Sequence, residues 1–195
     1  ESFVNSKQRR IPVSLDAPIF TLTHAMGFKG VLGGEYSFNR TEASVWKRFW
    51  LPSSWGKIDC SIKAGAEWNT VPFPLLILPE ANLSYITQRE TFNLINNMEF
   101  LNDRFASVSL SYDMNGKLFN RIPLIKNLKL REMFRVRALW GTLTDKNNPF
   151  KSSNPDLFRF PMRDGKFTSF VMDPKIPYVE ASVGIYNIFK LLHIA

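Results

Sequence analysis

The chain has 195 residues, a formal net charge of +8 and 14% aromatic residues. Its mean hydropathy is slightly negative, so bulky apolar side chains must be interleaved with polar ones. No stretch approaches the ~18 consecutive apolar residues of a transmembrane helix, since the longest apolar run, Val71 to Pro79, is short and proline-rich. These properties argue against a helical membrane protein and favour strands with two different faces.

The first candidate strands are Ile19 to Met26 and Tyr36 to Leu51. The glycines of Gly30 to Gly34 lie between them and lack the Lys-Ser/Thr ending of a phosphate-binding loop, so we expect a hairpin connection there. Pro52 to Gly56 has the composition of a tight turn. We therefore expect the strand that follows this turn to pair antiparallel with the strand that precedes it.

The clearest strand is Lys57 to Asn69. Apolar and polar residues alternate along it for six pairs, with Ile58, Cys60, Ile62, Ala64, Ala66 and Trp68 on one face. Such a length is close to the ~9–11 residues with which a strand crosses a bilayer.

Four further segments complete a count of about seven strands on the same alternation rule. Thr91 to Leu101 is a weaker candidate, and Asn102 to Arg104 is expected to turn. Ala106 to Asn115 and Tyr178 to Ile188 alternate cleanly. Phe134 to Thr144 also alternates, with Leu139 as an exception. No helix longer than one or two turns is expected.

The pattern predicts an all-β fold, and we favour an antiparallel transmembrane β-barrel. Backbone groups cannot remain unpaired in hydrocarbon, so strands in a membrane must close into a barrel. The charged face would then line the lumen, and its candidates are Lys57, Asp59, Lys63, Glu67, Arg135, Arg137 and Glu180. Aromatic residues near the strand ends would form interfacial girdles, and their candidates are Phe49, Trp50, Trp55, Trp68 and Trp140.

The alternative is a soluble all-β module that binds lipid or glycan, in which the same charged residues would simply face solvent. Strand length and the placement of the aromatic residues favour the barrel. Solubility without detergent would separate the two interpretations.

We expect no enzymatic chemistry. Asp59, Glu67 and Glu180 could be paired carboxylates for glycoside hydrolysis, but a polar face explains them without further assumptions. No serine lies in a nucleophile elbow, so we expect no catalytic residue. His24, His193 and the single Cys60 have no metal-spaced partners, so we expect no metal and no cofactor.

The basic charge suits anionic lipid or lipopolysaccharide. The basic clusters, residues 7–10 and 126–131, are short, so we expect no nucleic-acid partner.

An ordered set of segments resembles a known family, with a gap at residues 150–175. These segments are Ala17–Leu22, Phe28–Gly30, Gly33–Tyr36, Lys47–Trp50, Lys63–Gly65, Val71–Leu76, Met98–Phe100, Asp103–Ser107, Asn115–Gly116, Asn120–Ile125, Leu128–Glu132, Asp145–Pro149 and Pro177–Ile185. They resemble a family of large outer-membrane proteins of the Bacteroidota. In that family a domain of unknown function follows an N-terminal carboxypeptidase-regulatory-like domain.

The resemblance implies that residues 1–195 are a single β-barrel domain in the bacterial outer membrane. It implies contact with outer-membrane lipid, lipopolysaccharide and other envelope proteins, in transport, assembly or surface display, and it supplies no catalytic residues. Single-chain bacterial barrels have even strand numbers from ~8 upward. The odd count, together with an end at Leu192 to Ala195 that lacks a terminal aromatic residue, leads us to expect a portion of a larger barrel.

Overall fold

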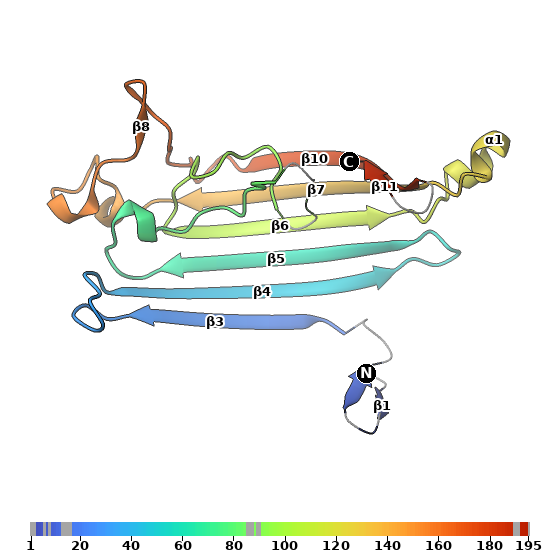
Figure 1. Ribbon diagram of the computed structural model, residues 1–195, viewed down its shortest axis with the longest axis horizontal. Helices are drawn as coiled ribbons and strands as arrows, with labels where there is room; N and C mark the ends of the chain where they lie inside the picture. Colours follow the sequence, from blue (N-terminus) through green and yellow to red (C-terminus); the bar gives the residue numbers. More distant parts are fainter. Residues whose placement is uncertain are drawn as a thin grey trace.

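The main feature of the computed structural model is an antiparallel sheet of seven strands (Figure 1). The structure describes residues 3–5, 7, 9–12, 17–84, 88, 91–188 and 192–194. The sheet has the order β11-β10-β7-β6-β5-β4-β3. Its strands are β3 (Ile19–Gly27), β4 (Phe38–Trp50), β5 (Lys57–Glu67), β6 (Arg104–Asp113), β7 (Arg131–Thr142), β10 (Tyr178–Ile188) and β11 (Leu192–Ile194). The all-β, antiparallel prediction is confirmed.

The alternation along each strand continues across the sheet because the strands pair in register. Ile62 of β5 lies opposite Val45 of β4 and Val108 of β6, so apolar residues meet apolar residues on one face. Asp59 lies opposite Arg48 and Ser111, so polar residues meet polar residues on the other face. Neighbouring strands thus give the sheet two chemically different surfaces.

The remaining elements are short. Two small hairpins are formed by β1 (Phe3–Asn5) with β2 (Arg10–Pro12), and by β8 (Met162–Arg163) with β9 (Lys166–Phe167). The helical turns are α1 (Pro123–Lys126), η1 (Phe73–Leu75), η2 (Phe119–Arg121), η3 (Asp145–Asn147) and η4 (Pro155–Leu157). In the part of the chain that the structure describes, no helix is long and apolar enough to cross a membrane.

The turn predicted at Pro52 to Gly56 is present and joins β4 to β5. The Leu51 amide donates to the Gly56 carbonyl at 2.9 Å, and Trp50 pairs with Lys57 where the strands begin to separate. Gly56 has a φ of +91°, and a Cβ there would lie 1.8 Å from the Asp113 carbonyl oxygen. Glycine is therefore required at this position. The glycine-rich segment also forms the expected connection, with the Gly30 amide bonded to the Gly34 carbonyl at 2.7 Å.

The prediction of a strand over Thr91 to Leu101 was wrong. In its described residues this segment is irregular, with isolated bridges from Phe92 to Ala81 and from Phe100 to Phe170. Phe92 and Ile95 are three positions apart and are both buried, so the segment does not present alternating faces. Its asparagines favour turns over extended pairing.

Other boundaries also differ from expectation. Asn102 to Arg104 is not a tight turn, because Asn102 forms a bridge with Ile77 and Arg104 already begins β6. The strand β11 was not predicted, and the turn expected at residues 189–191 lies outside the described residues.

The main sheet is open. Strands β3 and β11 are its two edges, and among the described residues these edges do not pair with each other. A closed barrel is therefore not observed.

Candidate functional site

One face of the main sheet is apolar and bare. We call it the apolar face, and its members include Phe20, Leu22, Val45, Phe49, Ile58, Cys60, Ile62, Val108, Leu110, Tyr112, Phe134, Val136, Trp140, Val179 and Val183. The exposed fraction is 75% for Leu22, 47% for Ile62 and 64% for Val183. An exposed apolar surface that runs continuously over six long strands is unusual for a protein surrounded by water.

The apolar face is bounded at both strand ends. Pairing aligns Phe49, Tyr112 and Phe134 across the sheet at the end near the Pro52–Gly56 turn. Lys47 belongs to this end, and its ammonium lies 5.0 Å from the centre of the Phe49 ring. A lysine that extends toward a rim of aromatic residues is typical of a membrane interface.

Trp68 and Trp140 mark the opposite end of the apolar face, and polar residues follow them. The Trp68 indole N–H donates to the Thr41 hydroxyl at 2.9 Å, and His24 bonds the same hydroxyl at 2.9 Å. Arg104 lies in register with Thr142 at this end. The apolar band thus gives way to hydrogen-bonding groups at a defined level along the strands.

Two of the predicted interfacial aromatics, Trp50 and Trp55, do not lie on the apolar face itself. Trp50 lies on the charged face, since its register partner is Lys57, and its ring contacts Arg48 and Lys57 at 5.7 and 5.8 Å. Trp55 lies in the turn, where the ammonium of Lys117 is 5.0 Å from its ring. Only Phe49, Trp68 and Trp140 of the predicted set lie at the ends of the apolar face.

All seven predicted charged residues share the other face, which we call the polar face. Lys57, Asp59, Lys63 and Glu67 project from β5, and Arg135, Arg137 and Glu180 project from β7 and β10 in matching register. The structure therefore brings together residues that are separated by more than a hundred positions.

Ion pairs organise the polar face. Arg48 binds Asp59 through two hydrogen bonds of 2.6 and 2.9 Å. The others are Arg137–Glu180 at 3.1 Å, Lys63–Glu80 at 2.7 Å, Arg40–Glu67 at 3.6 Å and Lys57–Asp113 at 3.9 Å. The charges of this face are thus largely compensated by one another.

Sequence reasoning missed several of these partners. Arg40 and Arg48 could have been assigned to the polar face, because they fall at even spacing along the strand predicted at Tyr36 to Leu51. Glu80 carried no such signal, because it lies in an irregular connection.

Serine hydroxyls line the polar face between the ion pairs. Ser44, Ser61, Ser107, Ser109 and Ser111 border a cavity of about 440 Å³ together with Trp46. Small neutral hydroxyls beside compensated charges form a surface that water wets readily.

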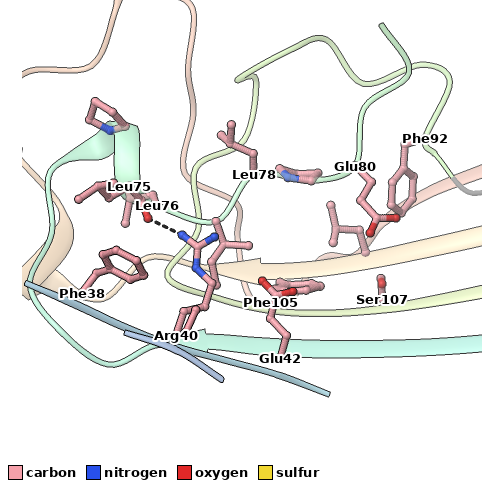
Figure 2. A pocket seen from close by; sticks show the side chains of 15 residues that line it. Phe38, Arg40, Glu42, Leu75, Leu76, Leu78, Glu80, Phe92, Phe105 and Ser107 are labelled. Carbon is pink, nitrogen blue, oxygen red and sulfur yellow. Dashed lines mark hydrogen bonds between the residues drawn. The ribbon is translucent and has the colours of Figure 1, made fainter. Parts of the chain in front are cut away.

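Two long connections fold over the polar face. We call the described parts of residues 68–103 and 143–177 the cover. Figure 2 shows Arg40 extending from β4 to the carbonyl of Leu75, which accepts its guanidinium N–H at 2.5 Å. Between this part of the cover and the sheet is a cavity of about 620 Å³, lined mainly by apolar side chains such as Leu75, Phe92 and Phe105.

Buried polar contacts fasten the cover to the sheet. Both oxygens of the Glu180 carboxylate accept from the Asn93 amide at 3.1 Å, and Arg137 donates to the Thr91 carbonyl. The Asp103 carboxylate joins the two parts of the cover, because it accepts from the Thr144 amide at 3.1 Å and from the Asn147 side chain at 3.0 Å.

Two small apolar clusters complete this attachment. Leu139 is 1% exposed and packs with Phe92, Ile95 and Met172, so the residue that broke the alternation of its strand is a contact between sheet and cover. Val71, Leu76, Leu101, Leu143 and Phe160 form the second cluster. The first cluster therefore joins the polar face to the cover, and the second joins the two parts of the cover and contacts the sheet through the partly buried Phe38.

The three carboxylates considered for glycoside hydrolysis each have an arginine partner. Asp59, Glu67 and Glu180 each contact an arginine, and each contacts a different one. Among the described residues, no group of three or more His, Cys, Asp or Glu side chains is placed to hold a metal ion. Cys60 has a free thiol on the apolar face.

The fold and its two faces define an antiparallel β-sheet protein with one bare apolar surface and one charged, covered surface. A family model described as the C-terminal domain of a family of unknown function, DUF5686, matches residues 1–150. The chain belongs to this family. Searches of the curated proteins and of the solved structures gave no match.

Proposed function

We propose that this chain forms part of the wall of a β-barrel in a bacterial outer membrane, with a non-catalytic role in transport, assembly or surface display. The apolar face contacts lipid, and the polar face lines a water-containing lumen that the cover partly fills. The open edges β3 and β11 pair with further strands to close the barrel, because unpaired backbone groups are costly in hydrocarbon. The resemblance noted above supports the Bacteroidota outer membrane as the location.

The observation that carries this proposal is the bare apolar face opposite a charged face. A soluble module would bury its apolar face and expose its charged face. Here the buried clusters and the cover lie on the charged side, and Leu22, Ile62 and Val183 remain exposed. An exposed apolar face opposite a covered charged face is stable in a lipid bilayer.

Strand length supports the same proposal. Strand β5 has 11 residues and β4 has 13. At ~3.3 Å per residue and a tilt of ~45°, eleven residues rise by roughly 25 Å, which is the height of the apolar band of outer-membrane barrels.

The single cysteine provides a direct test. Cys60 lies on the apolar face, and the adjacent Ser61 lies on the polar face. In the intact protein reconstituted into lipid vesicles, we expect Cys60 to resist labelling by a membrane-impermeant maleimide. The fluorescence of a label attached to Cys60 should be quenched by a quencher carried on the lipid. Ser61→Cys in a Cys60→Ser background is the matched control, and its label should escape the lipid quencher. Equal lipid quenching at both positions would contradict the proposal.

A further inference from the structure

The connection between β6 and β7 is strongly basic. It lies at the same end of the sheet as the Pro52–Gly56 turn (Figure 1). From Met114 to Arg131 the sequence contains no acidic residue, and its basic residues are Lys117, Arg121, Lys126, Lys129 and Arg131. Because the charges of the polar face compensate one another, this connection is a major location of the positive charge of the chain.

Bulky apolar side chains accompany these basic residues. Leu118, Ile122, Leu124 and Leu128 are all exposed, and Leu124 is 88% exposed. Trp55 of the neighbouring turn is also exposed. Basic residues interleaved with exposed leucine, isoleucine and tryptophan are typical of segments that lie in the headgroup region of a membrane.

A polar hollow lies between the turn and this connection. Its volume is about 380 Å³, and it is lined by Ser54, Asn115, Lys117, Asn120 and Arg121. The Lys117 ammonium donates to the Ser53 carbonyl at 2.8 Å and lies over the Trp55 ring, which fixes its position and leaves further N–H donors free to bind. The five lining residues include no Asp or Glu, although the Asp113 carboxylate accepts from the Asn115 amide at 2.9 Å and so occupies that donor. The side chains of Lys117 and Arg121 contribute cationic N–H donors to the lining, and such donors suit a phosphate.

We propose that this hollow binds the phosphate of an anionic glycerophospholipid, with the exposed leucines and isoleucine beside the acyl chains. The inference rests on the proposed membrane location and identifies a specific lipid contact within it. The lengths of the connections between strands indicate which membrane leaflet supplies the phosphate. The connections that leave and rejoin the sheet at its opposite end, residues 28–37, 68–103 and 143–177, include the longest of the chain. Outer-membrane barrels have short turns on the periplasmic side, where the leaflet consists of glycerophospholipids.

The test uses the intact protein in a neutral detergent and measures the binding of dihexanoylphosphatidylglycerol by calorimetry. The variant is Lys117→Gln with Arg121→Gln. The loss of one hydrogen bond between charged groups weakens binding by about tenfold or more, so we expect at least tenfold weaker binding. The matched control is Lys29→Gln with Lys166→Gln, at the opposite end of the sheet, and it should bind as the unmodified protein does.

Three results would overturn the inference. They are equal affinity of the unmodified protein for dihexanoylphosphatidylcholine, equal loss of affinity in the control pair, and tighter binding of lipid A than of the phosphatidylglycerol. Labelling of Cys60 separates this inference from the proposed function. A shielded Cys60 without phosphatidylglycerol preference refutes only the phosphate site, whereas an exposed Cys60 refutes the membrane location itself.

Discussion

Replacing Ile62 with arginine would place a charge at the middle of the apolar face. Ile62 is the central residue of β5, and Val45 and Val108 flank it on the neighbouring strands. Its side chain is 47% exposed, so an arginine side chain has room to extend away from the sheet without a steric clash. The cost of the substitution is therefore set by what surrounds this face.

The expected change in the free energy of unfolding depends on whether water or lipid surrounds the apolar face. In water, an exposed substitution of this kind changes the free energy of unfolding by about 0.5 kcal/mol at most. At the midplane of a bilayer, an arginine on the lipid face of a barrel costs ~2–4 kcal/mol. Because 1.4 kcal/mol is about a factor of ten, the larger range corresponds to roughly a thirtyfold or greater loss in the folding equilibrium constant.

The assay is denaturant-induced unfolding of the intact protein in phosphatidylcholine vesicles, followed by tryptophan fluorescence. Lys63→Arg is the matched control, since Lys63 is the next residue, lies on the polar face and keeps a positive charge near Glu80. We expect this control to unfold like the unmodified protein. Equal stability of Ile62→Arg and Lys63→Arg would refute the assignment of the faces.

Two further predictions concern the attachment of the cover. Arg137 and Glu180 have side chains that are 2% and 7% exposed, so Arg137→Ala should destabilise the protein by ~3–5 kcal/mol in denaturant unfolding, because it leaves a buried carboxylate unpaired. Arg137→Met with Glu180→Gln should cost less, because the neutral side chain keeps an oxygen that can accept from the Asn93 amide, and an equal or larger loss would refute this explanation. At Gly141 an added Cβ would lie 2.4 Å from the Asn102 side-chain oxygen, so Gly141→Ala should displace Asn102 and speed proteolysis within residues 70–103. Ser107→Ala should leave the proteolysis rate unchanged, and equal rates in the two variants would contradict this prediction.

The strands could be predicted because their two faces meet different surroundings. Tyr178 to Ile188 was predicted with its observed bounds, since Val179, Ala181 and Val183 alternate with Glu180, Ser182 and Gly184. The antiparallel pairing of β4 with β5 was predicted from the tight turn at Pro52 to Gly56, and the observed register places Trp50 opposite Lys57.

The cover could not be predicted, because its contacts are not periodic. Phe92 and Ile95 are buried by a surface built from β7 and by Met172, which lies far away in the sequence. The apolar composition of Thr91 to Leu101 therefore resembled a strand, although its burial comes from tertiary packing. The exception at Leu139 was the one visible sign that something apolar meets the polar face, and it gave no indication of the partner.

The order in which contacts can form during folding follows from the attachment of the cover. The strands from β3 to β7 each pair with a sequence neighbour, so the sheet can grow by adding one strand at a time. The carboxylate that holds Asn93 and Leu94 belongs to β10, whereas the segment it holds leaves the sheet after β5. These contacts must wait until β10 has paired with β7. Until then Asn93 and Leu94 lack their acceptor, whereas Arg137 and Leu139 of β7 can already hold Thr91, Phe92 and Ile95. Docking of this part of the cover therefore has two stages, the first on β7 and the second on β10.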